Sequence, residues 1–308
     1  MNARRREWVI LLAGGEGSRL LGQTVCGTRL DRPKQFCRIG DDQTLLRLAL
    51  ERAARLAEPE CIVPVVCALH RLWWGPELMD LPFDNVLVQP ENRGNAIAIL
   101  HALIHILQRD PDPLVVVMPS DHAVEDEAVL AVALRSAVRH ASERGGRVVL
   151  LGITPDAADA EYGWLVPGRE AGSLKSVRAF IEKPSRPTAA ALMRHGALWN
   201  SFIFASTGAG LLELYRRIQP ELLEDYLENL LDRGWGEGAL SRLYEDMEPL
   251  DFSCDLLEHA PEQLDVLRVD ACGWTDLGTP RRVAEWLEHR SLGVARHVRQ
   301  ELVLTNAR

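Results

Sequence analysis

Residues 12–20 read Leu-Ala-Gly-Gly-Glu-Gly-Ser-Arg-Leu, and residues 32–36 read Arg-Pro-Lys-Gln-Phe. An apolar run, Trp8 to Ala13, leads into the glycines, so the pattern predicts a buried strand that ends in a glycine-rich loop. Glycines allow backbone N–H groups to approach phosphate oxygens, and Arg19 and Lys34 add positive charge. The two segments together indicate a pocket for a polyphosphate.

Two common glycine-loop motifs do not fit this sequence. A dinucleotide-binding turn needs a third glycine where Leu20 stands, and an acidic residue where the chain has Arg32 to Lys34. A P-loop ends in Gly-Lys-Ser or Gly-Lys-Thr, which does not occur here. A plain tight turn after the strand stays open as an alternative, because short glycine motifs also arise by chance.

The composition narrows the class of protein. Of the 308 residues, 47% are hydrophobic and 26% are charged, which is typical of a globular protein with a sizeable core. The net charge of -9 argues against a general nucleic-acid-binding protein, which has a basic face. No apolar run reaches the roughly 18 residues that span a bilayer, so no membrane segment is expected. The six cysteines lack Cys-x-x-Cys spacing, which argues against a zinc site or disulfide framework and favours a reducing cytoplasm.

Short apolar runs alternate with amphipathic stretches through the first half of the chain. This alternation predicts an α/β fold whose sheet is covered by helices on both faces, with ligands at the carboxyl ends of the strands. The expected strands of this half are Trp8–Ala13, Cys61–Cys67, Asn85–Val88, Leu114–Met118 and Arg147–Ile153, and its expected helices are Thr44–Ala57, Asn95–Gln108 and Ala128–Arg144.

The second half is less regular. Its expected strands are Leu174–Ile181, Phe202–Ala205 and Leu264–Val269, and its expected helices are Thr188–Met193, Leu211–Gln219, Pro220–Asp232 and Pro280–His289. No repeat or low-complexity tract interrupts the chain, so we expect one continuous domain.

Two carboxylates follow expected strands. Asp121 comes just after Leu114–Met118, and Asp276 lies between glycines in Gly273–Thr279. One or two carboxylates, together with substrate phosphates, are typical of a Mg²⁺ site. The alternative for Asp121 is an N-cap on the following helix.

Lys183 and Asn200 are candidates for substrate binding. Pro184 ends the strand that carries Lys183, so this lysine lies at a strand end, where it is either a point charge for a phosphate monoester or plain surface. Asn200, beside Trp199, suits sugar hydroxyls or lies in a half-buried turn. His101 and His105 are four residues apart but lack the glutamate of the His-Glu-x-x-His motif, which favours a packing role.

Eight segments resemble, in the same order along the chain, those of the sugar-1-phosphate nucleotidylyltransferases, most closely the mannose-1-phosphate guanylyltransferase branch. Each motif is weak alone, whereas eight in family order are a specific signal. They are LAGGEGSRL (12–20), RPKQF (32–36), QPENRGNAIA (89–98), VVVMPSDH (115–122), YGWLVPG (162–168), FIEKP (180–184), WNSFIF (199–204) and GWTDLGT (273–279).

The resemblance implies a Rossmann-like nucleotide-diphospho-sugar transferase fold with a mixed, mostly parallel central sheet. It also implies a reaction in which a sugar 1-phosphate attacks the α-phosphorus of a nucleoside triphosphate in line and gives a nucleotide sugar and pyrophosphate. GTP and mannose 1-phosphate are the expected substrates, and Mg²⁺ is the expected cofactor. A phosphate monoester is already an anion, so catalysis depends on positioning and charge rather than on a general base.

Carried over to the matching positions, the resemblance assigns a role to each motif. Arg19 and Lys34 hold the β- and γ-phosphates, Asp121 and Asp276 hold Mg²⁺, and Lys183 binds the phosphate of the sugar and aligns its attack; these five are the expected catalytic residues. The expected nucleotide-binding residues are Leu12, Ala13, Gly14, Gly15, Gly17, Ser18, Glu91, Arg93 and Asn95, and the expected sugar-phosphate-binding residues are Gly163, Glu182, Lys183 and Asn200.

The resemblance also divides the single domain, residues 1–308, into a nucleotide-binding half (about 1–155), a sugar-phosphate-binding half (about 156–290) and a tail (291–308). Family members are often dimers, so a homodimer is expected, without a nucleic-acid or membrane partner.

The sequence departs from the family pattern in three places. The guanylyltransferases read Arg-Asn-Thr-Ala-Pro-Ala where this chain has Arg-Gly-Asn-Ala-Ile-Ala at 93–98, which leaves the base open. Phe202 stands where the family has glycine after Trp-Asn-Ser, and a ring there would reshape the sugar pocket. Extra residues at about 22–30 would form a lid, or stay disordered without substrate.

Two other functions remain to be weighed. A glycosyltransferase of similar fold would need an Asp-x-Asp motif, which Ser120-Asp121-His122 does not supply. A catalytically silent regulator that binds nucleotide sugars is disfavoured because charged site residues such as Lys34 and Lys183 are present. A nucleotidylyltransferase that uses another base or sugar also stays open.

Overall fold

The first strand is buried on both faces, and this explains its place in the fold. In the computed structural model, β1 (Glu7–Leu12) buries Trp8 and Ile10 in one hydrophobic core and Val9 and Leu11 in another. Because successive side chains of a strand point to opposite faces, β1 must lie inside a sheet that is covered on both sides. The structure describes residues 5–17, 20–25, 28–29, 31–233 and 237–291.

A nine-stranded sheet forms the centre of the described structure, in the order β5-β4-β1-β6-β10-β7-β11-β9-β8. The predicted mixed sheet is confirmed. Pairing is parallel along β5-β4-β1-β6 and between β7 and β11 and antiparallel elsewhere, so parallel pairs make up about half of the sheet rather than most of it. The remaining strands are β4 (Ile62–Cys67), β5 (Leu87–Gln89), β6 (Leu114–Pro119), β7 (Val148–Ile153), β8 (Trp164–Ala171), β9 (Leu174–Ile181), β10 (Leu198–Thr207) and β11 (Leu264–Val269).

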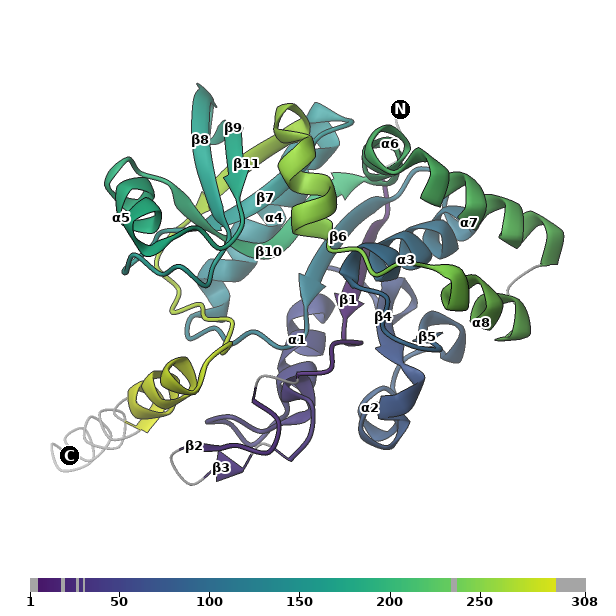
Figure 1. The fold of residues 1–308 in the computed structure, drawn as a ribbon, viewed down its shortest axis with the longest axis horizontal. Coiled ribbons are helices and arrows are strands. Elements are labelled where there is room, and N and C mark those ends of the chain that lie inside the picture. Colours follow the sequence, from purple (N-terminus) through teal and green to yellow (C-terminus); the bar gives the residue numbers. More distant parts are fainter. Residues whose placement is uncertain (1–4, 18–19, 26–27, 30, 234–236, 292–308) are drawn as a thin grey trace, which may run out of the picture.

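Helices cover both faces of this sheet (Figure 1). The helices α3, α6 and α7 contribute to the core that contains Trp8, and α1 and α4 to the core that contains Val9. The helices are α1 (Leu45–Ala54), α2 (Arg71–Glu77), α3 (Asn95–Arg109), α4 (Glu127–Arg144), α5 (Arg186–Arg194), α6 (Gly208–Ile218), α7 (Pro220–Arg233) and α8 (Glu237–Asp246), and residues 280–291 are also helical. No helix of the described residues is long and apolar enough to cross a bilayer.

Strand β10 connects the two predicted halves of the chain. It lies between β6 and β7 and runs antiparallel to both. The register shifts between Asn200 and Phe204, which is a β-bulge, and Phe202 within it has a φ of 58°. The predicted strand at 202–205 is therefore confirmed but extends further at both ends.

The helix at 280–291 packs the motif at 273–279 against the segment that follows the motif at 12–20. A third apolar cluster contains Leu20, Leu277, Val283 and Trp286, and the indole N–H of Trp286 donates to the backbone oxygen of Ile39 at 2.9 Å. The predicted helix at 280–289 is confirmed, and it holds the Asp276 loop against the segment that follows the glycine loop.

The extra residues near 22–30 include two short strands, β2 (Thr24–Val25) and β3 (Thr28–Arg29), which pair antiparallel. Residues 26–27 and 30 lie outside the described residues. The proposed lid stays a prediction.

His101 has the packing role that its sequence context favoured. It is buried on α3, and its Nδ1 forms a hydrogen bond with the hydroxyl of Tyr226 on α7. Burial lowers the pKa of His101 to about 3, with a smaller contribution from His105. The native protein therefore holds this imidazole neutral.

We expect acid to destabilise the fold through His101. Between pH 6.5 and about 3 the unfolded chain binds a proton that the native state excludes, so the free energy of unfolding falls as the pH falls. The limiting slope for one such group is about 1.4 kcal/mol per pH unit. Urea unfolding between pH 7 and pH 4.5 measures how steeply the free energy of unfolding falls with pH. In His101→Gln, whose side chain does not titrate, this fall should be less steep. Equal slopes for the two proteins would contradict the assignment.

Candidate active site

The glycine loop and the Asp121 segment leave neighbouring strands at the same edge of the sheet. Leu12 of β1 is in register with Pro119 of β6, and the next residue, Ser120, donates to the backbone oxygen of Leu12 from its N–H (3.1 Å) and from its hydroxyl (2.7 Å). The glycine loop and the Asp121 segment, about 100 residues apart in the chain, therefore lie next to each other at the carboxyl ends of parallel strands.

The glycine loop is fastened to the segment that carries Lys34. The side-chain amide of Gln35 donates to the backbone oxygens of Ala13 (3.1 Å) and Gly15 (2.6 Å). Gly17 has a φ of 61°, and a Cβ there would lie 2.7 Å from the backbone nitrogen of Lys34, so this close approach requires glycine. Ser18 and Arg19 lie outside the described residues, and their roles stay predictions.

Lys34 connects the two segments that carry the candidate metal carboxylates. Its buried ammonium lies 3.0 Å from Oδ2 of Asp121 and also donates to the backbone oxygen of Asp276. Burial alone would raise the pKa of Asp121, but the charges of Lys34 and His122 outweigh it, so this pKa lies below its usual range. Three predicted catalytic residues from distant segments thus form one charged cluster.

The same cluster lines a small cavity of about 280 Å³, formed by Gly17, Leu20, Lys34, Asp121, His122, Asp276 and Gly278. Its two carboxylates suit a hard cation that keeps water and phosphate oxygens as further ligands, as Mg²⁺ does. Within the described ranges, no group of three or more His, Cys, Asp or Glu side chains could hold a metal ion, so a closed protein cage is not formed there. The donor set therefore fits a cation that shares its ligands with a substrate.

Asp121 does not cap the following helix. The N-cap of α4 is Asp126, whose Oδ1 accepts hydrogen bonds from the backbone N–H groups of Ala128 (3.0 Å) and Val129 (3.1 Å). The structural alternative for Asp121 was therefore wrong, and its carboxylate is available to the cavity.

A second cavity, of about 510 Å³, adjoins the first and shares Asp121 and His122 with it. Burial lowers the pKa of His122 to about 4, an effect that Asp121 partly opposes. The lining includes Asn95, whose Nδ2 donates to Asp251 at 3.2 Å and whose Oδ1 accepts from the N–H of Phe252 at 2.6 Å. The lining residues are Leu12, Gly14, Gly15, Gln35, Gln89, Asn92, Gly94, Asn95, Ala98, Pro119, Ser120, Asp121, His122, Phe202 and Asp251.

Glu91 and Arg93, expected near the base, do not line either cavity. Arg93 donates from Nε to the backbone oxygen of Tyr244 (2.8 Å) and from Nη2 to Glu91 (2.8 Å). These contacts attach the 91–95 segment to the end of α8, so the guanidinium of Arg93 is used within the protein.

Gly163, Glu182 and Asn200 lie side by side. The N–H of Asn200 donates to the backbone oxygen of Gly163 at 2.8 Å, and a Cβ at Gly163 would lie 2.4 Å from Oε2 of Glu182. Burial raises the pKa of Glu182 despite the nearby charge of Lys183, whose ammonium lies 3.5 Å from Oε1 of Glu182 and is half exposed. The structure thus groups the four predicted sugar-phosphate residues, although none of them lines the two cavities.

Backbone strain coincides with three of the motifs. In the described part of the chain, the non-glycine residues with positive φ are Lys183 (43°), Phe202 (58°) and Leu277 (48°). Such conformations cost of order 1–3 kcal/mol each and cluster at functional sites. Each of these residues belongs to a segment chosen from the sequence, which supports a functional role for those segments.

Sequence reasoning missed several lining residues. Gln35 and Gln89 stand inside quoted motifs, so a signal for them existed, and the buried Gln89 amide donates to the hydroxyl of Tyr244 at 2.8 Å. Asp251 belongs to no motif, and only the folded chain brings it to the wall beside Asn95.

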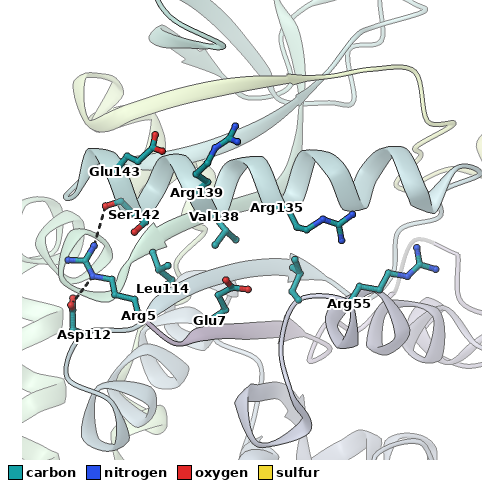
Figure 2. Close-up of a pocket in the computed structure, with 11 residues that line it drawn as sticks. Arg5, Glu7, Arg55, Asp112, Leu114, Arg135, Val138, Arg139, Ser142 and Glu143 are labelled. Carbon is teal, nitrogen blue, oxygen red and sulfur yellow. Dashed lines mark hydrogen bonds and ion pairs between the residues drawn. The ribbon is translucent and has the colours of Figure 1, made fainter. Parts of the chain in front are cut away.

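A larger cavity, of about 1060 Å³, lies at the opposite edge of the sheet (Figure 2). It is lined by Glu7 and Leu114, the first residues of β1 and β6, and by arginines that include Arg5, which pairs with Asp112 at 2.8 Å. It contains none of the predicted site residues and is not the candidate active site.

The chain is similar to known proteins over most of its length. The family model described as nucleotidyl transferase matches residues 8–290. Xanthan biosynthesis protein XanB of Xanthomonas campestris pv. campestris (strain B100) is 30% identical over 297 residues, which cover 94% of this chain and 61% of that protein. Mannose-1-phosphate guanylyltransferase 2 of Escherichia coli O157:H7 is 31% identical over 291 residues, which cover 88% of this chain and 58% of that protein. The chain thus spans about three fifths of the length of these curated relatives.

The chain is also similar to a solved structure. The crystal structure described as mannose-1-phosphate geranyltransferase from Thermus thermophilus has a TM-score of 0.77 and 30% sequence identity, and the match covers 89% of this chain and 76% of that one. The fold is therefore shared with this protein.

Proposed function

Since the chain belongs to the nucleotidyl transferase family, we propose that it transfers the nucleotidyl group of GTP to mannose 1-phosphate and releases pyrophosphate. The observation that carries this proposal is the convergence of Lys34, Asp121 and Asp276 at one small cavity beside the glycine loop. The names of similar proteins, which include mannose-1-phosphate guanylyltransferases, support the choice of base and sugar.

Different residues of the site have different roles in an in-line displacement at the α-phosphorus. The backbone N–H groups of Gly14, Gly15 and Gly17, with the charge of Lys34, bind the triphosphate. Mg²⁺, held by Asp121 and Asp276, supplies positive charge to the phosphate oxygens when it is bound. Catalysis then rests on orientation and on preorganised charge.

We assign the sugar 1-phosphate to the group of residues around Gly163. Lys183 binds its phosphate as a point charge, and Glu182 and Asn200 bind its hydroxyls beside Gly163. The 89–95 segment faces the base, with Asn95 at the cavity wall and Glu91 and Arg93 behind it. Leu12, Ala13, Ser18 and Arg19 complete the triphosphate side.

The oligomeric state, the compartment and the partners of the protein also belong to the proposal. We also propose that the protein is a cytoplasmic homodimer without a nucleic-acid or membrane partner; the net charge of -9 supports the absence of a nucleic-acid partner. Light scattering of the purified protein tests the dimer directly.

Pyrophosphate release tests the function. The protein is incubated with Mg²⁺, each of four nucleoside triphosphates and a panel of sugar 1-phosphates. We expect the largest release with GTP and mannose 1-phosphate. A different best pair would correct the specificity, and no release with any pair would contradict the enzyme and favour a silent nucleotide-sugar-binding regulator.

Lys183→Ala should weaken the sugar substrate selectively. Loss of one charge-assisted contact costs about 1.5–3 kcal/mol, so the KM for the sugar 1-phosphate should rise about 10- to 100-fold with little change in the KM for the nucleotide. Lys175→Ala is the matched control, because Lys175 lies near the start of β9, the strand that leads to Lys183, and pairs with Glu170 at 2.9 Å, away from the motif. An unchanged KM for the sugar 1-phosphate would contradict the role of Lys183.

A further inference from the structure

The two carboxylate oxygens of Asp276 have different surroundings. Oδ1 accepts hydrogen bonds from the N–H of Gly278 (2.9 Å) and from Nη1 of Arg282 (2.7 Å). Among the described residues, no hydrogen bond reaches Oδ2. One oxygen is thus held by the protein and the other is left for a ligand.

Arg282 has contacts on several sides, although its buried Nη2 makes no hydrogen bond in the described structure. It is 5% exposed, its Nη2 lies 2.8 Å from Oδ2 of Asp159, and its guanidinium lies 3.8 Å from the centre of the Tyr162 ring. The planar guanidinium is suited to such combined stacking and pairing, which a flexible ammonium cannot reproduce. Tyr162 in turn packs on Trp199 and Trp274, with ring centres 4.6 and 5.3 Å apart.

Charge balance also favours a role in the site. Asp159 lies beside both Arg282 and Arg281, and Arg281 also pairs with Glu285. These four side chains offset one another, so the negative charge of Asp276 remains to attract a cation. A buried ion pair adds little net stability by itself, which makes a purely stabilising role a poor explanation for burying this arginine. Partners behind a metal ligand commonly orient it.

We propose that Arg282 is a positioning residue: by holding Oδ1 of Asp276, it presents Oδ2 to the bound cation. The sequence around Asp276 does not reveal this role, because Arg282 reaches back from the first turn of the helix at 280–291. The inference rests on the proposed function only in treating Asp276 as a cation ligand.

The test measures binding of Mn²⁺ alone to the nucleotide-free protein by electron paramagnetic resonance, with Asp276→Asn as the reference that lacks the site. Removing Arg282 alone would change the charge beside the cation, so the main variant is the double substitution D159N/R282M, which removes the guanidinium and its counter-charge together. We expect its Mn²⁺ affinity to fall about 10- to 100-fold while its circular dichroism stays native.

Arg281→Met is the matched control. Arg281 is the adjacent arginine and lies 3.3 Å from the same Asp159, but its side chain is 64% exposed and forms no hydrogen bond or ion pair with Asp276 in the described structure. Its Mn²⁺ affinity should stay within about twofold of wild type. If the double variant does not fold, R282K serves instead, because one ammonium cannot hold Asp276 and Asp159 in the same geometry; we expect a loss of about threefold to tenfold.

Wild-type affinity in D159N/R282M, or in R282K where that variant replaces it, would overturn the proposal. So would an equal loss in Arg281→Met, or a wild-type protein that binds Mn²⁺ no better than Asp276→Asn. Failure of the proposed function is seen separately, as the absence of pyrophosphate release by the wild type with every substrate pair.

Discussion

Replacing Asp121 by asparagine should lower kcat/KM for pyrophosphate release by about two to three orders of magnitude, the usual cost of losing one preorganised charge contact at a reacting phosphate or oxyanion. Asparagine keeps the size of the side chain but removes the charge that pairs with Lys34 and that we assign to the cation. Steady-state pyrophosphate release, measured over a range of Mg²⁺ concentrations, checks the loss.

The same substitution should leave the protein folded. Breaking a fully buried ion pair costs about 3–5 kcal/mol, and the cost here should be smaller because the Asp121 side chain is 34% exposed. Asp126→Asn is the matched control: it is the same substitution five residues further on, at a helix N-cap where asparagine is equally suitable. Near-normal turnover in Asp121→Asn, or an equal loss in Asp126→Asn, would refute the metal role.

Gly94→Ala should give the largest loss of stability, about 3 kcal/mol or more in the free energy of unfolding. Gly94 has a φ of 87°, and a Cβ there would lie 2.1 Å from the backbone oxygen of Leu250. That oxygen cannot move freely, because Leu250 donates its N–H to Arg93 at 3.1 Å and accepts from the N–H of Ala96 at 3.2 Å. An alanine at position 94 would therefore have both a strained backbone conformation and a steric clash with Leu250.

Urea unfolding measures the effect of Gly94→Ala. Gly15→Ala is the control, because a Cβ at Gly15 meets no atom within 4 Å and its φ is not positive. We expect a clear drop in the unfolding midpoint for Gly94→Ala and a small change for Gly15→Ala. Equal midpoints would show that the 93–96 and 250 segments separate easily, contrary to their hydrogen bonds.

The sequence predicted the parts of the site that follow directly from strand ends. A buried strand must stop where glycines or a proline follow it, so the positions of the glycine loop and of Asp121 could be derived from residues nearby. The place of β10 was harder to predict, because this strand belongs to the 156–290 segment but pairs with β6 and β7 of the 1–155 segment.

Other contacts could not be derived from local pattern. Arg93 has the chemistry of a ligand-binding residue, but its guanidinium is used to hold Tyr244 of α8, about 150 residues away along the chain. Asp251 and Arg282 reach the site only because tertiary packing places them there. Strand β8 was missed because Pro167 and Gly168 interrupt its apolar pattern, although it pairs along β9.

The position of β10 also determines when the sheet can close during synthesis. Strands β6 and β7 are complete by Ile153, but β6 keeps one unpaired side until β10 (Leu198–Thr207) has left the ribosome, and β7 has no partner strand until β10 and then β11 (Leu264–Val269) follow. Pairings between distant segments form late, and exposed strand edges are sites of aggregation in the meantime. A nascent chain halted before residue 198 therefore exposes one side of β6 and leaves β7 without a partner strand, so we expect chaperones to bind the nascent chain mainly in this interval.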